Sequence, residues 1–173
     1  MSDQLPKHVD AHRLARQESR LVGTIPVSRL ARLGAFLSDH RGTAEAELQF
    51  GMDPGGIEFV RGRVQAELAL VCQRCLEPLT EWVRAEFCLG LAASEALAAR
   101  LPEVYEPVLV GDEPLGTWEL IEDELILALP IVPRHEPQQC AAQVPREPKA
   151  EPGEERPNPF AALEQLKHKG RSD

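Results

Sequence analysis

Hydrophobic and polar residues alternate along three consecutive stretches of the chain, at 44–50, 57–71 and 80–90. An alternation with a period of two residues is typical of β-strands that bury one face and expose the other. Short turn-forming segments separate the three stretches, and strands joined in this way pair antiparallel. The pattern therefore predicts an antiparallel β-meander with one buried face, and a further strand is expected at 20–27.

Three other segments, at 28–37, 94–101 and 117–129, place apolar residues at helical spacing. The third has the widest apolar face. It begins with Thr117 and carries acidic residues in its first turn, which favours a capped helix start, and Pro130 ends it. We expect this helix to pack on the buried face of the sheet. The predicted fold class is therefore α+β, an antiparallel β-meander packed by a few helices.

Local features of the chain allow three finer predictions. Gly62 interrupts the second alternating stretch, and we interpret it as a β-bulge. Residues 105–110 have the composition of a short strand. The first twelve residues are polar, and we expect them to be frayed.

The composition changes after the last predicted helix and divides the chain into three parts. We predict a single α+β domain over 1–140, a disordered linker rich in proline and glutamate over 141–157, and a short amphipathic tail over 158–173. Phe160 and Leu163 lie on one face of the tail at helical spacing. Two interpretations remain open: the tail docks on its own domain, or it folds on a partner.

Composition and charge restrict the classes of protein to which the chain can belong. Of the 173 residues, 43% are hydrophobic and 27% are charged, which is typical of a soluble globular protein. No apolar run approaches the ~20 residues that span a bilayer, and the N-terminus lacks a signal sequence, so we expect a cytoplasmic protein without membrane contact. The net charge of −9 argues against broad binding to nucleic-acid phosphates.

Negative charge is concentrated between residues 103 and 124, where eight acidic residues occur without a lysine or arginine. Such a cluster is either a solvated acidic surface or a surface that attracts a basic protein. On the second interpretation, a partner contacts acidic residues of the last helix together with the apolar face of the tail. These candidate partner-binding residues are Glu119, Glu122, Asp123, Glu124, Phe160 and Leu163.

Residues 1–42 carry an excess of arginine, which supports an alternative function in RNA binding. The segment does not interleave these arginines with the aromatic residues on which bases stack, and this weakens the alternative. The candidate RNA-binding residues are Arg13, Arg16, Arg20, Arg29 and Arg32.

Cys72 and Cys75 form a C-x-x-C pair at the turn between the second and third alternating stretches. This spacing occurs in half of a zinc site, in a redox-active disulfide, and by chance as two small turn residues. A redox pair favours a helix N-terminus, whereas Pro78 and the strand that follows argue against a helix here. The choice between zinc ligands and turn residues depends on a second pair of ligands.

His135 and Cys140 follow the last predicted helix and supply such a pair, which completes a Cys3His set for a structural Zn²⁺ ion. The remaining cysteine, Cys88, lies on a strand and is interpreted as a small packed residue, or as a spare ligand in place of His135. Four protein ligands leave no position for a catalytic water. The sequence also has no paired acid–base residues and no phosphate-binding glycine loop, so we expect neither catalysis nor a small-molecule substrate.

Four sequence blocks resemble the YceD family, whose members are called large ribosomal RNA subunit accumulation proteins. The blocks occur in the order seen in the family and span most of the chain. They are LVCQRCLEPL at 70–79, LPEVYEP at 101–107, EDELILALPIVP at 122–133 and NPFAAL at 158–163.

The resemblance implies a ribosome-biogenesis role in the synthesis, processing or stability of the large-subunit 23S rRNA. Many bacterial members are encoded beside a small ribosomal protein, which fits an acidic adaptor. Its implied partner is a basic ribosomal protein or a pre-ribosomal particle, with rRNA as a further candidate. Many relatives carry a cysteine pair where this chain has His135 and Cys140, which supports the zinc assignment. The histidine and the longer spacing are departures from that pattern.

Overall fold

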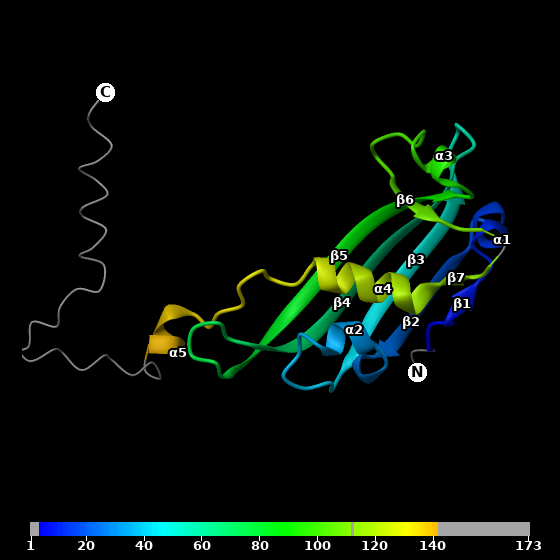
Figure 1. Ribbon diagram of the computed structural model, residues 1–173. Helices are drawn as coiled ribbons and strands as arrows, with labels where there is room; N and C mark the ends of the chain where they lie inside the picture. The colour runs from blue at the N-terminus through cyan, green and yellow to red at the C-terminus, as the bar shows by residue number, and fades with distance from the viewer. Residues whose placement is uncertain (1–3, 112, 142–173) are drawn as a thin grey trace, which may run out of the picture. The chain divides into compact units, whose positions relative to one another are not determined.

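A five-stranded β-sheet forms the centre of the structure, a computed structural model that describes residues 4–111 and 113–141 (Figure 1). The strand order is β2-β3-β4-β5-β6, and the strands from β2 to β5 pair antiparallel in sequence order. The predicted α+β fold with an antiparallel meander is therefore confirmed. The five strands are β2 (Arg20–Pro26), β3 (Thr43–Met52), β4 (Glu58–Val71), β5 (Pro78–Ala92) and β6 (Glu106–Leu109).

The last strand, β6, joins the sheet in an orientation that the sequence pattern did not indicate. It runs parallel to β5, with Glu106 opposite Leu89 and Leu109 opposite Ala92. A parallel neighbour requires a crossover connection, and here the chain returns through a segment that contains the short helix α3 (Glu95–Ala98). As a result, β6 covers only the C-terminal end of β5.

One face of the sheet lies in the hydrophobic core, and the other faces solvent. Along β4, for example, Val60, Val64 and Leu68 are buried, whereas Arg61 and Arg63 are exposed. Removal of this apolar surface from water holds the layers together. None of the helices in the described part of the chain has the length and hydrophobicity to cross a membrane. The buried face packs against α1 (Ala11–Arg16), α2 (Ala31–Gly34) and α4 (Thr117–Leu127) (Figure 1).

The helix α4 covers the sheet with the apolar face that the sequence pattern predicted, and Leu120 and Leu125 are buried in the core. The predicted helix cap was wrong, because Gly116 occupies the N-cap position and the Thr117 hydroxyl donates to the carbonyl of Pro6. Thr117 is fully buried. A buried hydroxyl requires a hydrogen-bond partner, and the N-terminal segment supplies it.

The N-terminal segment is part of the fold, so the prediction of frayed ends was wrong from residue 4 onward. Leu5 is 1% exposed, its N–H donates to the Thr24 carbonyl at 3.1 Å, and its own carbonyl accepts the Trp118 indole N–H at 2.8 Å. Next, β1 (His8–Val9) pairs with β7 (Leu115–Gly116). One buried leucine and these distant partners fix a segment whose polarity alone suggested disorder.

The helix predicted at 28–37 is replaced by two short helices. A 3₁₀ helix, η1 (Val27–Arg29), precedes α2, and Leu30 between them has a ψ of 83°, outside the helical region. The carboxylate of Glu122 accepts the backbone N–H of Arg32 at 2.7 Å. A helix start usually takes its cap from the residue before it. Here the capping group comes from α4, which the local sequence cannot show.

Gly62 lies in a regular part of the β-ladder, so the predicted β-bulge was wrong. It pairs with Leu48 on one side and Phe87 on the other without a break in either register. A Cβ atom at this position would lie 2.0 Å from Cζ of Phe87. The cross-strand aromatic ring therefore requires the glycine, since the ring packs directly over the backbone of β4.

Replacing Gly62 with alanine is expected to lower the free energy of unfolding by about 1–3 kcal/mol, because the added methyl group displaces the Phe87 ring. Urea unfolding followed by circular dichroism measures the change. The double variant Gly62→Ala/Phe87→Leu should recover part of the loss, since the smaller side chain leaves room for the methyl group. An alanine variant as stable as the wild type would contradict this explanation of the glycine.

A histidine–carboxylate pair connects the N-terminal helix to the sheet. His12 on α1 contacts Glu58 at the start of β4 through Nδ1, and its Nε2 lies 3.3 Å from the Val110 carbonyl oxygen. The hydrogen bond to Glu58 raises the pKa of His12 above 6.5, and the Val110 carbonyl adds to this effect against the opposing influence of burial. Folding therefore favours the protonated form of His12.

Replacing His12 with glutamine is expected to destabilise the protein most below pH 6.5, where the histidine is protonated in both the folded and unfolded states. The loss should shrink as the pH rises through the higher pKa of the folded state. Urea unfolding of both proteins at a series of pH values measures the difference, with His8→Gln as an exposed control. A loss that stays constant with pH would show that the charge of His12 does not stabilise the fold.

Candidate metal centre

Four side chains with metal-binding atoms meet where the β4–β5 hairpin turn faces the segment after α4. The ligand atoms of Cys72, Cys75, His135 and Cys140 all lie within 4.8 Å of one another. The two pairs are far apart in sequence: 60 residues separate Cys75 from His135, and 68 separate Cys72 from Cys140. The structure thus brings together the four residues that the sequence analysis proposed as a ligand set, in a cluster that could bind a metal ion.

The hairpin turn presents two thiols to this cluster. It closes with a hydrogen bond from the Cys72 N–H to the Glu77 carbonyl at 3.0 Å, and Leu76 adopts a φ of 63°. Left-handed residues allow a chain to reverse direction over few residues. Within the turn, the Arg74 N–H donates to the Sγ of Cys72 at 3.5 Å. The turn therefore supplies a hydrogen-bond donor to one thiol as well as two ligand atoms.

The opposing segment is attached to the hairpin by its backbone. The Gln73 N–H donates to the Pro133 carbonyl at 2.8 Å, and the short helix α5 (Pro137–Ala141) carries Cys140. Nε2 of His135 lies 3.1 Å from the Pro78 carbonyl oxygen. A proton on Nε2 satisfies this carbonyl and leaves Nδ1 free to coordinate a metal ion. This second contact fixes both the ring orientation and the tautomer.

The distances between ligand atoms match those around a single four-coordinate ion. The Sγ atoms of Cys72 and Cys140 are 3.7 Å apart, and Sγ of Cys75 lies 3.3 Å from Nδ1 of His135. Tetrahedral bonds of ~2.3 Å to sulfur and ~2.0 Å to nitrogen separate two sulfurs by about 3.8 Å and a sulfur from a nitrogen by about 3.5 Å. The donor set and these two distances are therefore compatible with a four-coordinate metal ion.

Burial and hydrogen bonds give the thiols of the cluster different acidities. Cys72 and Cys140 are fully buried beside Leu70 and Leu79. Burial opposes ionisation of Cys72, but the surrounding backbone N–H groups, that of Cys75 foremost, lower its pKa to about 5. Burial and the two neighbouring cysteines raise the pKa of Cys140 to about 11. A bound metal ion favours the thiolate form of every cysteine ligand, so metal binding would release protons.

Cys88 lies outside the cluster, and His135 occupies the position for which Cys88 was the alternative ligand. Cys88 faces Arg61 across the β4–β5 ladder, on the strand that starts at Pro78 beside the cluster. At the rise of a β-strand, the distance along β5 from Pro78 to Cys88 is on the order of 30 Å. Cys88 cannot take the place of His135, which the structure already positions among the other ligands.

Glu122, one of the predicted partner-binding acids, is instead part of the interior. It is 6% exposed, and its carboxylate accepts Nε–H of Arg32 at 3.0 Å in addition to the backbone N–H of that residue. Asp123 also pairs with the Arg32 guanidinium. Removing Arg32 would leave the buried Glu122 carboxylate without its cationic partner. Glu122 therefore joins α4 to α2 and is not accessible to a partner.

The remaining described acids of this group reach the surface of α4. Glu119 and Asp123 are exposed, and Glu119 lies 3.7 Å from Lys7. Glu124 is half-buried, and burial together with the negative charges of Glu106 and Asp123 raises its pKa. Negative charge on this side of α4 is therefore only partly balanced. The other two predicted partner-binding residues lie outside the described residues, and they are Phe160 and Leu163.

The arginines of the RNA-binding alternative are largely engaged in ion pairs. Nε of Arg20 lies 2.8 Å from Glu47, and Arg32 binds two carboxylates of α4. Only Arg29 has no such partner among the described residues. Each pair neutralises positive charge that would attract phosphate groups. The partners of Arg13, Arg16, Arg20 and Arg32 are, respectively, Asp10, Glu58, Glu47 and Glu122 with Asp123.

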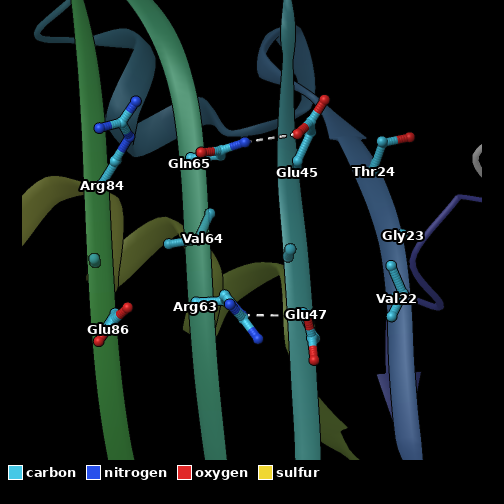
Figure 2. Close-up of a pocket in the computed structure, with 12 residues that line it drawn as sticks. Val22, Gly23, Thr24, Glu45, Glu47, Arg63, Val64, Gln65, Arg84 and Glu86 are labelled. Carbon is cyan, nitrogen blue, oxygen red and sulfur yellow. Dashed lines mark hydrogen bonds and ion pairs between the residues drawn. The ribbon is translucent and has the colours of Figure 1, made fainter.

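A hollow on the open face of the sheet is lined by residues of four strands (Figure 2). Polar side chains meet across the strands: Nε of Arg63 lies 3.2 Å from Glu47, and the Gln65 amide donates to Glu45 at 2.9 Å. Cross-strand pairs of this kind stabilise a sheet modestly. The hollow therefore presents a ladder of paired surface groups, and these groups do not converge on one reacting position.

The fold and the cluster define a small α+β protein with a four-ligand centre able to bind a metal ion. The profile of the family described as "Large ribosomal RNA subunit accumulation protein YceD" matches residues 60–167. A protein of that name from Haemophilus influenzae is 36% identical over 171 residues, which cover 95% of this chain and 97% of the relative. The chain belongs to the YceD family, as its sequence blocks suggested. No solved structure matches the chain.

Replacing Cys72 with serine is expected to abolish metal binding and to lower the midpoint of thermal unfolding by several degrees, since the ligands join distant segments. Elemental analysis of anaerobically purified protein measures the metal directly. Cys88→Ser is the matched control, and it should retain one metal ion per chain. Wild-type protein without metal, or a Cys72→Ser variant with a full equivalent, would rule out this centre.

Proposed function

We propose that this protein is a non-catalytic ribosome-biogenesis factor that supports the synthesis, processing or stability of the large-subunit 23S rRNA. The observation that carries the proposal is its membership of the YceD family. The similarity to the Haemophilus influenzae relative extends over nearly the whole of both chains. A relative of this coverage shares the full domain, so the role that its name describes is proposed for this chain as well.

In this proposal the cluster holds a structural Zn²⁺ ion. Three thiols and one imidazole form a soft, four-ligand set that zinc occupies in structural sites. The ion would be held by Cys72, Cys75, His135 and Cys140. Its contribution is mechanical, because it attaches the chain after α4 to the β4–β5 hairpin and so fixes the helix on the sheet.

The absence of an enzymatic activity is part of the proposal. Four protein ligands leave the metal without an open position for water or substrate, which catalytic zinc sites require. On the open face of the sheet, Arg63 pairs with Glu47 and Gln65 bonds to Glu45 across the strands. These features support a protein that acts by binding.

A basic ribosomal protein, or a precursor particle that contains one, is the proposed partner. Exposed Glu119 and Asp123 and half-buried Glu124 lie on α4. The repulsion that raises the pKa of Glu124, after the effect of burial, comes from Glu106 and Asp123. A cationic partner would relieve this repulsion. Direct RNA binding is the weaker alternative, because four of its five candidate arginines are already paired with carboxylates.

Complementation of a Haemophilus influenzae strain that lacks the related protein tests this function. We expect the strain to contain less 23S rRNA relative to 16S rRNA, and we expect this chain to restore the ratio. The Glu119→Lys/Glu124→Lys variant should restore it poorly, because it removes negative charge at the proposed partner surface. The matched control is Glu67→Lys/Glu95→Lys, which changes the net charge equally at two other exposed positions.

Failure of the wild-type chain to restore the rRNA ratio, despite normal expression, would refute the proposed function. Equal activity of the two charge variants would refute the assignment of the partner surface to α4. The two outcomes are distinct, because the second leaves the rRNA phenotype itself intact.

A further inference from the structure

Among the described residues, the outer edge of β5 has no strand partner over most of its length. This strand pairs with β4 from Pro78 to Gly90, but with β6 only from Leu89 onward. Figure 1 shows the consequence: β6 lies beside one end of β5, and the rest of the strand borders the sheet. An exposed strand edge offers a row of backbone donors and acceptors to another chain.

The direction of these backbone groups follows from the alternation of an antiparallel ladder. The Cys72 N–H donates to the Glu77 carbonyl, so these two residues are a hydrogen-bonded pair of the ladder. The backbone groups of odd-numbered residues of β5 therefore bond to β4, and the N–H and C=O groups of even-numbered residues point outward. Two contacts agree with this alternation. The Ala92 carbonyl accepts the Val110 N–H at 2.9 Å, and the Pro78 carbonyl faces Nε2 of His135.

Between Pro78 and the start of the pairing with β6, the outward-pointing groups belong to five residues of β5. The outward N–H and C=O groups of the first four meet no described residue, whereas the fifth, Cys88, adjoins the pairing that starts at Leu89. The free edge ends at His135 on one side and at Glu106 of β6 on the other, and it spans roughly 30 Å. Its residues are Thr80, Trp82, Arg84, Glu86 and Cys88.

A row of α4 residues and the chain that follows it run alongside this free edge. Glu124 and Leu127 are spaced at i and i+3, which places them on one side of α4, and Ile131 lies in the chain that follows the helix. The row begins near Glu106 of β6, because the charge of Glu106 contributes to the raised pKa of Glu124. The chain then continues to His135, which contacts Pro78 at the other end of the edge. Leu127 is 76% exposed and Ile131 is 97% exposed.

The charges around the free edge select a basic occupant. Four carboxylates lie along it: Glu81 and Glu86 on β5, Glu106 on β6 and Glu124 on α4. Arg84, a cation on the same strand, stands over the Trp82 ring with its guanidinium carbon 5.8 Å from the ring centroid. Figure 2 shows Arg84 and Glu86 at the border of the open face. A second copy of the chain would bring these carboxylates against their own equivalents, which is unfavourable.

We propose that the free edge of β5 binds an extended, basic segment of a protein partner as an added strand from Thr80 to Cys88. Alternate side chains of this segment would contact Leu127 and Ile131 on one side and Glu86 on the other. The proposal rests on the proposed function, since it specifies where and how the basic partner binds. Main-chain hydrogen bonds would provide affinity, and the acidic groups would provide the selection for lysine and arginine.

Amide hydrogen exchange of the full-length protein tests the site directly. The probe is a nine-residue peptide of alternating lysine and valine with blocked ends, and its control is the same peptide with every backbone nitrogen methylated. The first peptide should slow exchange at the Trp82, Arg84 and Glu86 amides at least tenfold. The amides of Glu81 and Val83, which already bond to β4, should change little. The methylated peptide should protect none of them.

The Glu86→Pro variant removes one outward N–H and should abolish this protection. Proline is tolerated on an edge strand where the missing N–H is not part of the ladder, and circular dichroism checks that the variant folds. Glu86→Ala is the matched control, because it removes the same side chain but keeps the N–H, and it should retain most of the protection. Where the proline variant does not fold, the comparison of the two peptides on the wild type decides the question.

Two results would overturn the proposal. The lysine–valine peptide could protect amides elsewhere on the protein and leave those of β5 unchanged. Alternatively, the outward amides could exchange slowly in the free protein, which would mean that the chain itself or a second copy already covers the edge. In the rRNA complementation assay, an active Glu86→Pro variant would reject this binding mode alone, whereas an inactive wild type would reject the proposed function.

Discussion

The convergence of two distant segments on one cluster is the constraint on which the rest of the structure depends. The β4–β5 hairpin turn and the segment after α4 supply two ligands each, and 60 residues separate Cys75 from His135. Between them lie the whole of β5, β6 and α4. A metal ion bound by the cluster would join the ends of this long loop and stabilise the folded chain. The cluster therefore fixes α4 on the sheet from its C-terminal side.

The opposite end of α4 is fixed by different interactions. The Thr117 hydroxyl and the Trp118 indole bind carbonyl groups of the N-terminal segment, and Glu122 caps α2. These contacts hold the helix in one orientation over the sheet, with Leu120 and Leu125 in the core and Glu119 and Asp123 on the surface. Because both ends are held, the position of the row from Glu124 to Ile131 relative to the free edge of β5 is fixed. The structural centre and the proposed binding edge are thus parts of one arrangement.

Much of the fold could be predicted from the sequence, because local patterns encode it. The alternation in β3, β4 and β5 identified the meander and its buried face, and the spacing of cysteines and histidine identified the ligand set. The parallel pairing of β6 could not be predicted, since a four-residue strand carries too little pattern to reveal its neighbour. The roles of Thr117, Glu122 and Gly62 depend on Pro6, Arg32 and Phe87, respectively, all remote in sequence or on another strand.

X-ray absorption spectroscopy at the zinc edge of the purified, full-length protein tests the central claim most directly. A closed Cys3His centre predicts a first shell of three sulfur atoms at ~2.3 Å and one nitrogen atom at ~2.0 Å. This result would mean that the hairpin turn and the segment after α4 share one ion. A first shell of oxygen and nitrogen atoms without sulfur, or the absence of zinc from the protein, would contradict the account.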